Sequence, residues 1–118
     1  MSHIEGEGTL VRIFIGEADR LGGRALYEAI VLAAREMGLG GATVLRGIAG
    51  FGADSVFHTT RLLRMSQDLP VVVEVVDSEE RLTRLLPEVD HMMSEGMVTM
   101  EKVRVLRYTP NGQSKLQP

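Results

Sequence analysis

The sequence predicts an α+β domain with the element order βαββαβ, because one pattern occurs twice along the chain. In each half, a β-branched apolar run is followed by apolar residues at helical spacing and then by a second β-branched run. The matching strands of the two halves lie about 60 residues apart, which indicates two similar half-units. At 118 residues, the chain has the length of one domain. This order is typical of the ferredoxin-like sandwich, a four-stranded antiparallel sheet with two helices on one face.

The first half begins with a predicted strand over residues 10–15, in which β-branched and aromatic side chains predominate. Residues 16–23 form a polar break that contains glycine. A helix is predicted from Leu26, since an apolar stripe follows at positions i+3, i+4 and i+7, and Gly38 is its expected C-terminal cap. A second strand is predicted over residues 43–48.

The second half begins with the clearest predicted strand, residues 71–76, which Pro70 introduces. Asp77 is the expected N-cap of the next helix, and Glu80 completes a capping box. Pro87 lies within this helix and predicts a kink or a restart there. The apolar stripe of the helix repeats that of the first one and consists of Leu82, Leu85, Leu86, Val89 and Met93.

A fourth strand is predicted from residue 98 to about residue 108, with an interruption at Glu101 and Lys102. The folded domain is therefore expected to span residues 9–108. Residues 1–8 and 109–118 are expected to be flexible ends, since both are mostly polar.

The composition excludes several classes of function. The chain has no cysteine, which excludes disulfides, thiolate zinc sites, iron–sulfur clusters and cysteine nucleophiles. A net charge of −3 and 4% aromatic residues, none of them tryptophan, argue against nucleic-acid binding. No apolar run reaches the roughly 20 residues of a membrane span, and the N-terminus lacks the features of a signal peptide. We therefore expect a cytoplasmic protein without membrane insertion.

The third predicted strand indicates self-association. Val71, Val73 and Val75 point to one face, while Val72 and Val76 point to the other face together with the carboxylate of Glu74. Two helices cover only one face, so an apolar second face favours packing against a partner chain. Glu74 is expected to need a cationic partner or a ligand hydroxyl, with a structural ion pair as the more economical interpretation.

The segment between the second and third predicted strands, residues 47–68, is long enough to suggest a function. Its glycine-rich start would let backbone N–H groups approach an anion, although simple turns use the same glycines. His58 lies among polar residues, and a hydrogen-bonded structural role is its alternative. Guanidinium groups suit phosphate or carboxylate ligands, with solvated surface positions or ion pairs as the alternative. The arginines concerned are Arg46, Arg61, Arg64, Arg104 and Arg107.

The stretch GLGGATVLRGIAGFG, residues 38–52, resembles the PII signal-transduction superfamily, in which a Gly-x-Thr-Val strand leads into Gly-Phe-Gly. The longer stretch LYEAIVLAAREMGLGGATVLRGIAGFG, followed by LPVVVEVVDSEE, resembles a PII-like family of unknown function. The resemblance covers residues 9–108, nearly the whole chain.

This resemblance implies a homotrimer that binds an adenine nucleotide, AMP or ADP, in the clefts between subunits. The loop after the second strand would report the ligand state to a partner protein. Genes of the family often neighbour a fluoride-channel gene, which suggests a membrane or cytoplasmic target for regulation. Carried over by position, the ligand-binding residues are Gly50, Phe51 and Gly52 of one subunit; Gly41, Ala42 and Thr43 of its neighbour; and Glu74, Val76, Arg104 and Arg107.

The chain also departs from the PII pattern. Residues 53–55, Ala-Asp-Ser, replace the basic and amide residues that follow Gly-Phe-Gly in PII proteins, and a glycine-lysine loop is reduced to residues 95–99. Triphosphate binding, uridylylation and nitrogen sensing are therefore not implied. We expect a protein without catalytic activity. The alternatives are a metal- or ion-responsive trimer that uses His58, or a small enzyme with His58 or Glu74 as its acid–base group.

Overall fold

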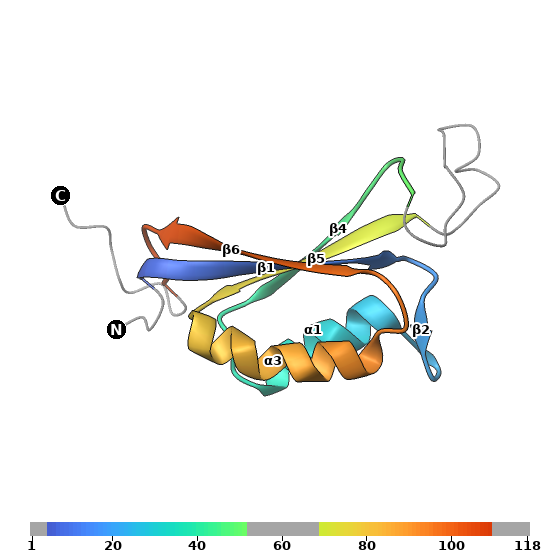
Figure 1. Cartoon of the computed structure of the whole chain (residues 1–118), viewed down its shortest axis with the longest axis horizontal. Helices are drawn as coiled ribbons and strands as arrows, with labels where there is room; N and C mark the ends of the chain where they lie inside the picture. The colour runs from blue at the N-terminus through green and yellow to red at the C-terminus, as the bar shows by residue number, and fades with distance from the viewer. Residues whose placement is uncertain (1–4, 52–68, 110–118) are drawn as a thin grey trace.

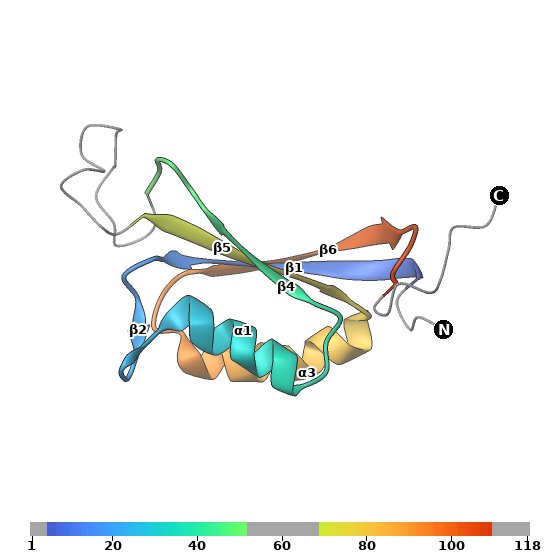
Figure 2. The same ribbon diagram turned by 180° about the vertical axis from the view of Figure 1, so that it is seen from behind.

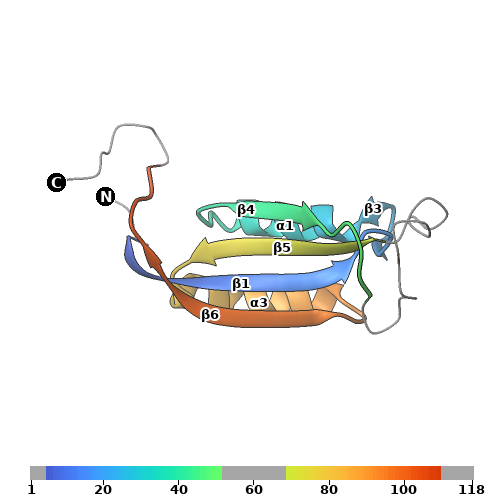
Figure 3. The same ribbon diagram turned by 90° about the horizontal axis from the view of Figure 1, so that it is seen from above.

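The computed structural model describes residues 5–51 and 69–109. A four-stranded antiparallel sheet carries two helices on one face, which confirms the predicted ferredoxin-like α+β fold (Figure 1). Seen from above, the strands lie in the order β4-β5-β1-β6 (Figure 3). Their bounds are β1 Gly6–Gly16, β4 Ala42–Arg46, β5 Pro70–Asp77 and β6 Met97–Val105.

Helices α1, Leu26–Glu36, and α3, Glu79–Met92, lie side by side against the sheet (Figure 2). Their apolar stripes are buried because they pack against the inward-facing side chains of the two central strands. As predicted, Gly38 ends α1: it adopts φ +74°, and its N–H donates to the carbonyl of Arg35. The fully buried side chains of the core include Val11, Ile13, Ile30, Val73, Val75, Leu82, Leu85 and Val89.

The start of α3 differs from the prediction by one residue. Ser78, not Asp77, is the N-cap, and its hydroxyl accepts a hydrogen bond from the Arg81 N–H at 3.2 Å. Asp77 instead ends β5 with its side chain fully buried. The predicted restart at Pro87 is also wrong, because α3 is one helix on both sides of this residue. The exposed ring of Pro87 lies opposite the buried stripe that fixes the helix on the sheet.

The predicted interruption of the fourth strand is wrong as well. β6 continues through Glu101 and Lys102, which pair with Leu10 and Thr9 of β1. Because β6 is an edge strand, both charged side chains stay exposed to water. The strand ends at Val105, three residues before the predicted end.

Two regular elements lie outside the predicted ones. β1 begins at Gly6, so residues 6–8 already pair with β6. Within the polar break, β2 (Arg20–Leu21) and β3 (Arg24–Ala25) form a short hairpin, whose turn contains Gly22 at φ +62°. Strands of two residues carry too little apolar periodicity to be recognised in a sequence.

Candidate functional site

The face of the sheet opposite the helices has no covering element among the described residues (Figure 1). The strand register places one apolar row across this face, formed by Leu45, Val72, Phe14 and Met97 of the four adjacent strands. Leu45 is 47% exposed and Met97 is 54% exposed. We call this surface the open face. Its apolar row agrees with the sequence pattern that predicted self-association.

A polar row lies next to the apolar one and contains the predicted site residue Glu74. The Nε of Arg12 donates to Oε2 of Glu74 at 3.0 Å, and Arg12 also pairs with Glu101. The hydrogen bond to Glu74, followed by that to Glu101, raises the pKa of Arg12 above its usual range. Glu74 thus forms the structural ion pair that the sequence predicted for a charge in an apolar strand. Its partner, Arg12, was not among the predicted site residues.

The end of β4 leads into the candidate ligand loop. Arg46 forms an ion pair with Glu17, and the N–H of Gly47 donates to the carbonyl of Pro70 at 2.7 Å. A Cβ at Gly47 would lie 2.8 Å from Cγ of Pro70, so close backbone approach explains this glycine. Gly50 adopts φ +148° and Phe51 is 69% exposed. The first glycines therefore serve the turn, while the ring of Phe51 is accessible to a ligand.

The other predicted site residues lie between the centre of the sheet, where Thr43 pairs with Glu74, and its opposite end. Gly41 and Thr43, at the start of β4, are exposed, and Ala42 is half-buried. Arg104, near the end of β6, and Arg107, just after it, are also exposed. The half-buried Val76 pairs with Leu10 on the open face near this end.

The predicted arginine cluster is thus divided within one chain. Arg46 is at the end of the sheet where β1 finishes, and Arg104 pairs with Glu7 where β1 begins. A strand of the length of β1 spans roughly 33 Å. The structure does not bring these residues together in a single subunit. The predicted positions Gly52, His58, Arg61 and Arg64 lie outside the described residues.

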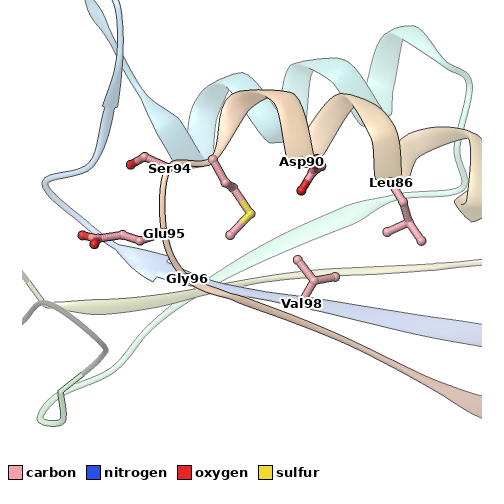
Figure 4. Close-up of a pocket in the computed structure, with 7 residues that line it drawn as sticks. Leu86, Asp90, Ser94, Glu95, Gly96 and Val98 are labelled. Carbon is pink, nitrogen blue, oxygen red and sulfur yellow. The ribbon is translucent and has the colours of Figure 1, made fainter.

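A surface cavity of about 400 Å³ lies between the end of α3 and the start of β6. Leu86 and Asp90 point from α3 toward Val98, while Ser94 and Glu95 lie on the connection (Figure 4). None of these residues was among the predicted site positions. Across residues 5–51 and 69–109, no cluster of three or more potential metal-ligating side chains occurs. The helices of the same described part include none that is long and apolar enough to span a membrane.

Two side chains that shape this surface were missed at the level of sequence. Arg12 is the only charged residue in the predicted strand 10–15, as Glu74 is in the predicted strand 71–76, and this symmetry could have paired them. Tyr108, on the segment after β6, donates its hydroxyl to the carbonyl of Gly40 at 2.9 Å. No local pattern in the sequence indicates a contact between positions 68 residues apart.

A protein-family model described as DUF190, Uncharacterized ACR, COG1993, matches residues 8–105. The chain belongs to the DUF190 family. A UPF0166 protein of Aquifex aeolicus (strain VF5) is 39% identical to this DUF190 chain over 97 residues, which are 82% of the chain and 91% of the relative. A UPF0166 protein of Methanocaldococcus jannaschii is 31% identical over 99 residues, 83% of the chain and 91% of that relative.

Two solved structures share the fold of the DUF190 chain. CPII from Thiomonas intermedia K12, bound to ADP and bicarbonate, superposes with a TM-score of 0.62 at 17% identity, covering 86% of this chain and 90% of CPII. A second structure, of CPII as a nitrogen regulatory PII-like protein bound to ADP, AMP and bicarbonate, has a TM-score of 0.59 at 16% identity, with coverage of 86% and 94%. The fold is therefore PII-like, as the resemblance implied.

Proposed function

We propose that this protein is a PII-like regulatory protein without catalytic activity that binds AMP or ADP between the subunits of a homotrimer. In this proposal, the bound nucleotide changes the loop after β4 and thereby the fit of that loop to a partner protein. A ligand shifts such an equilibrium only if it binds one loop state more tightly than another.

The observation that carries the proposal is the division of the candidate site between the two ends of the sheet. Phe51 follows β4 toward one end of the sheet, whereas Gly41 precedes β4 and Arg107 follows β6 at the other end. Phe51 and Arg107 lie beyond opposite ends of the sheet, separated by roughly the 33 Å length of β1, which is more than a nucleotide spans. Two subunits that pack with their sheets together would place one end of each beside the other, so assembly would complete the site.

The open face supports the assembly step. Its apolar row is partly exposed in the single chain, and a monomer gains nothing from holding such side chains in water. At the centre of the face, the Arg12 and Glu74 ion pair would enter the interface already neutralised, which lowers the cost of removing water from either charge. The adenine nucleotides held by the PII-like protein CPII favour this ligand class over others.

A thermal-shift titration with AMP, ADP, ATP and GTP tests the ligand. A nucleotide at about 100 times its dissociation constant adds about 2.7 kcal/mol to the free energy of unfolding per site, which raises the Tm by about 10 °C for a domain of this length. We expect this rise with AMP or ADP and none with GTP. An unchanged Tm with every adenine nucleotide would contradict the proposal.

Two further measurements on the same protein test the alternative functions. A rise in Tm with a divalent metal ion, reversed by a chelator, would instead favour the metal-responsive trimer. Chromatography of the incubated nucleotide tests the small-enzyme alternative. We expect the nucleotide to be recovered unchanged, and steady turnover would contradict the regulatory role.

A further inference from the structure

A buried carboxylate joins the end of β5 to the loop that precedes β4. Asp77 is 0% exposed, and its Oδ2 accepts a hydrogen bond from the N–H of Gly40 at 2.7 Å. Its Oδ1 accepts from the N–H of Ser78 at 2.7 Å and lies 3.1 Å from Nε of Arg81. Two backbone donors and the guanidinium charge of Arg81 therefore compensate this carboxylate for its removal from water.

Two further side chains hold the same loop by its carbonyl groups. Arg81 uses the other arm of its guanidinium to donate to the carbonyl of Gly38, so one side chain spans Asp77 and the loop. Tyr108 donates its hydroxyl to the carbonyl of Gly40 at 2.9 Å, and its own N–H donates to Glu5 at 2.8 Å. The segment after β6 thus crosses the end of the sheet to reach the loop at the opposite edge.

These contacts fix a loop that would otherwise have few constraints. Residues 38–41 contain three glycines, and glycine loses the most conformational freedom on ordering. The cluster binds the carbonyl of Gly38 and both the N–H and the carbonyl of Gly40, while Gly41 and Thr43 remain exposed. A buried ion pair adds little net stability compared with apolar packing. The effect of the Asp77–Arg81 pair is therefore to fix the position of the residues at which β4 begins.

We propose that Asp77, Arg81 and Tyr108 are positioning residues that hold Gly41–Thr43 in the conformation that receives the nucleotide. This inference rests on the proposed function, because it takes these residues as the part of the site that one subunit contributes. The three residues act through the backbone of the loop. Tyr108 adds a link between residues 38–41, which precede β4, and the segment after β6, so the two are ordered together.

The Tyr108→Phe variant tests the proposal, since it removes only the hydroxyl that binds Gly40 and keeps the ring. Thr83→Val is the matched control, because the Thr83 hydroxyl also donates to a backbone carbonyl, that of Glu79, on the exposed side of α3. We expect Tyr108→Phe to weaken ADP binding about three- to tenfold in calorimetry, the range of one hydrogen bond. The Tm should fall slightly and by the same amount in both variants. Thr83→Val should bind ADP with the affinity of the wild type.

Arg81→Lys gives a second, conservative test, because it keeps the charge beside Asp77 but loses the planar fork that also reaches Gly38. We expect a loss of ADP affinity of similar size. Wild-type affinity in both Tyr108→Phe and Arg81→Lys would overturn the positioning role.

Amide hydrogen exchange without ligand separates this inference from the proposed function. The peptide that covers residues 38–46 should exchange faster in Tyr108→Phe than in the wild type or in Thr83→Val. Unchanged exchange would overturn the inference even if the wild type binds ADP. If the wild type binds no nucleotide, the proposed function fails. Faster exchange confined to this peptide would then still show that Tyr108 holds residues 38–41 in place.

Discussion

Arg12 and Glu74 form an ion pair within an otherwise apolar part of the sheet. Each is the only charged residue in the central part of its strand, and the register places them opposite each other. Cross-strand neighbours lie close enough for an ion pair without distortion of either strand. The pair allows the open face to carry charge at its centre while its flanking row stays apolar.

The raised pKa of Arg12 sets the pH dependence of this pair. A group whose pKa is raised on folding contributes its full stabilisation below its ordinary pKa and loses it only as the pH rises through the raised pKa, which for an arginine lies far above neutral pH. We therefore expect Arg12→Met to lower the Tm by the same amount at about pH 6 and about pH 9, where carboxylates stay ionised. Arg84→Met, on the exposed side of α3, is the control. A smaller fall in Tm at about pH 9 than at about pH 6 would show that the stabilisation does not come from the charged Arg12.

Gly96 is required by its backbone and by its surroundings. It adopts φ +134°, and a Cβ there would lie 2.5 Å from the carbonyl oxygen of Phe14 and 2.6 Å from Cε of Met93. Gly96→Ala should lower the free energy of unfolding by about 1–3 kcal/mol in urea titrations. Gly41→Ala, where a Cβ meets nothing within 4 Å, should stay within about 0.5 kcal/mol. Equal effects of the two substitutions would contradict this account.

At the scale of elements, α3 shows which features of the sequence were decisive. Its buried stripe of Leu82, Leu85 and Val89 holds the helix on the sheet, and this outweighs the missing N–H of Pro87. The sequence therefore predicted the existence of the helix correctly, while its predicted restart depended on local propensity alone. Tertiary packing determined the outcome.

Replacement of Pro87 measures this cost. In Pro87→Ala, an N–H becomes available to the carbonyl of Thr83, one turn earlier in α3. We expect the free energy of unfolding to rise by about 1–2 kcal/mol, after the greater freedom of the unfolded chain is subtracted. Glu88→Ala, at the next exposed position, should change it by less than about 0.5 kcal/mol. A loss of stability in Pro87→Ala would show that the proline has a positive structural role.

Strand interiors were predictable and strand ends were not. Val71, Val73 and Val75 point to the helices as the alternation of side chains requires. The one-residue difference between Asp77 and Ser78 at the start of α3 could not be predicted, because both residue types cap helices well. Only the contact of Asp77 with Gly40, 37 residues away, decides between them.

For the whole molecule, the resemblance proposed which residues form the candidate site, but it did not give their arrangement. The predicted strand over residues 43–48 already separates Gly41 from Phe51, but a linear sequence does not show that this strand lies at one edge of the sheet and Arg107 beyond the other edge strand. The division becomes visible only in the fold, and it gives the proposed assembly a function beyond covering apolar surface.

The assembly has a direct test in two exposed leucines. Leu45 lies on the open face and is 47% exposed, whereas Leu21 lies on the β2–β3 hairpin and is 41% exposed. In analytical ultracentrifugation, we expect a wild-type trimer and an unchanged trimer for Leu21→Glu. Leu45→Glu should weaken association at least about tenfold, because a charge would enter an apolar interface without a partner. A stable Leu45→Glu trimer would place the interface elsewhere.

In the proposed trimer, two subunits share each nucleotide site, and a mixture of two variants can reveal this sharing. Gly41→Asp and Phe51→Asp alter opposite ends of the site at exposed positions, and each homotrimer should lose ADP binding. After refolding in equal amounts, random assembly restores both ends at about a quarter of the sites in a cyclic trimer. We expect calorimetry of the mixture to recover about this fraction of the wild-type ADP sites. No recovery in the mixture, or wild-type binding by either homotrimer, would contradict it.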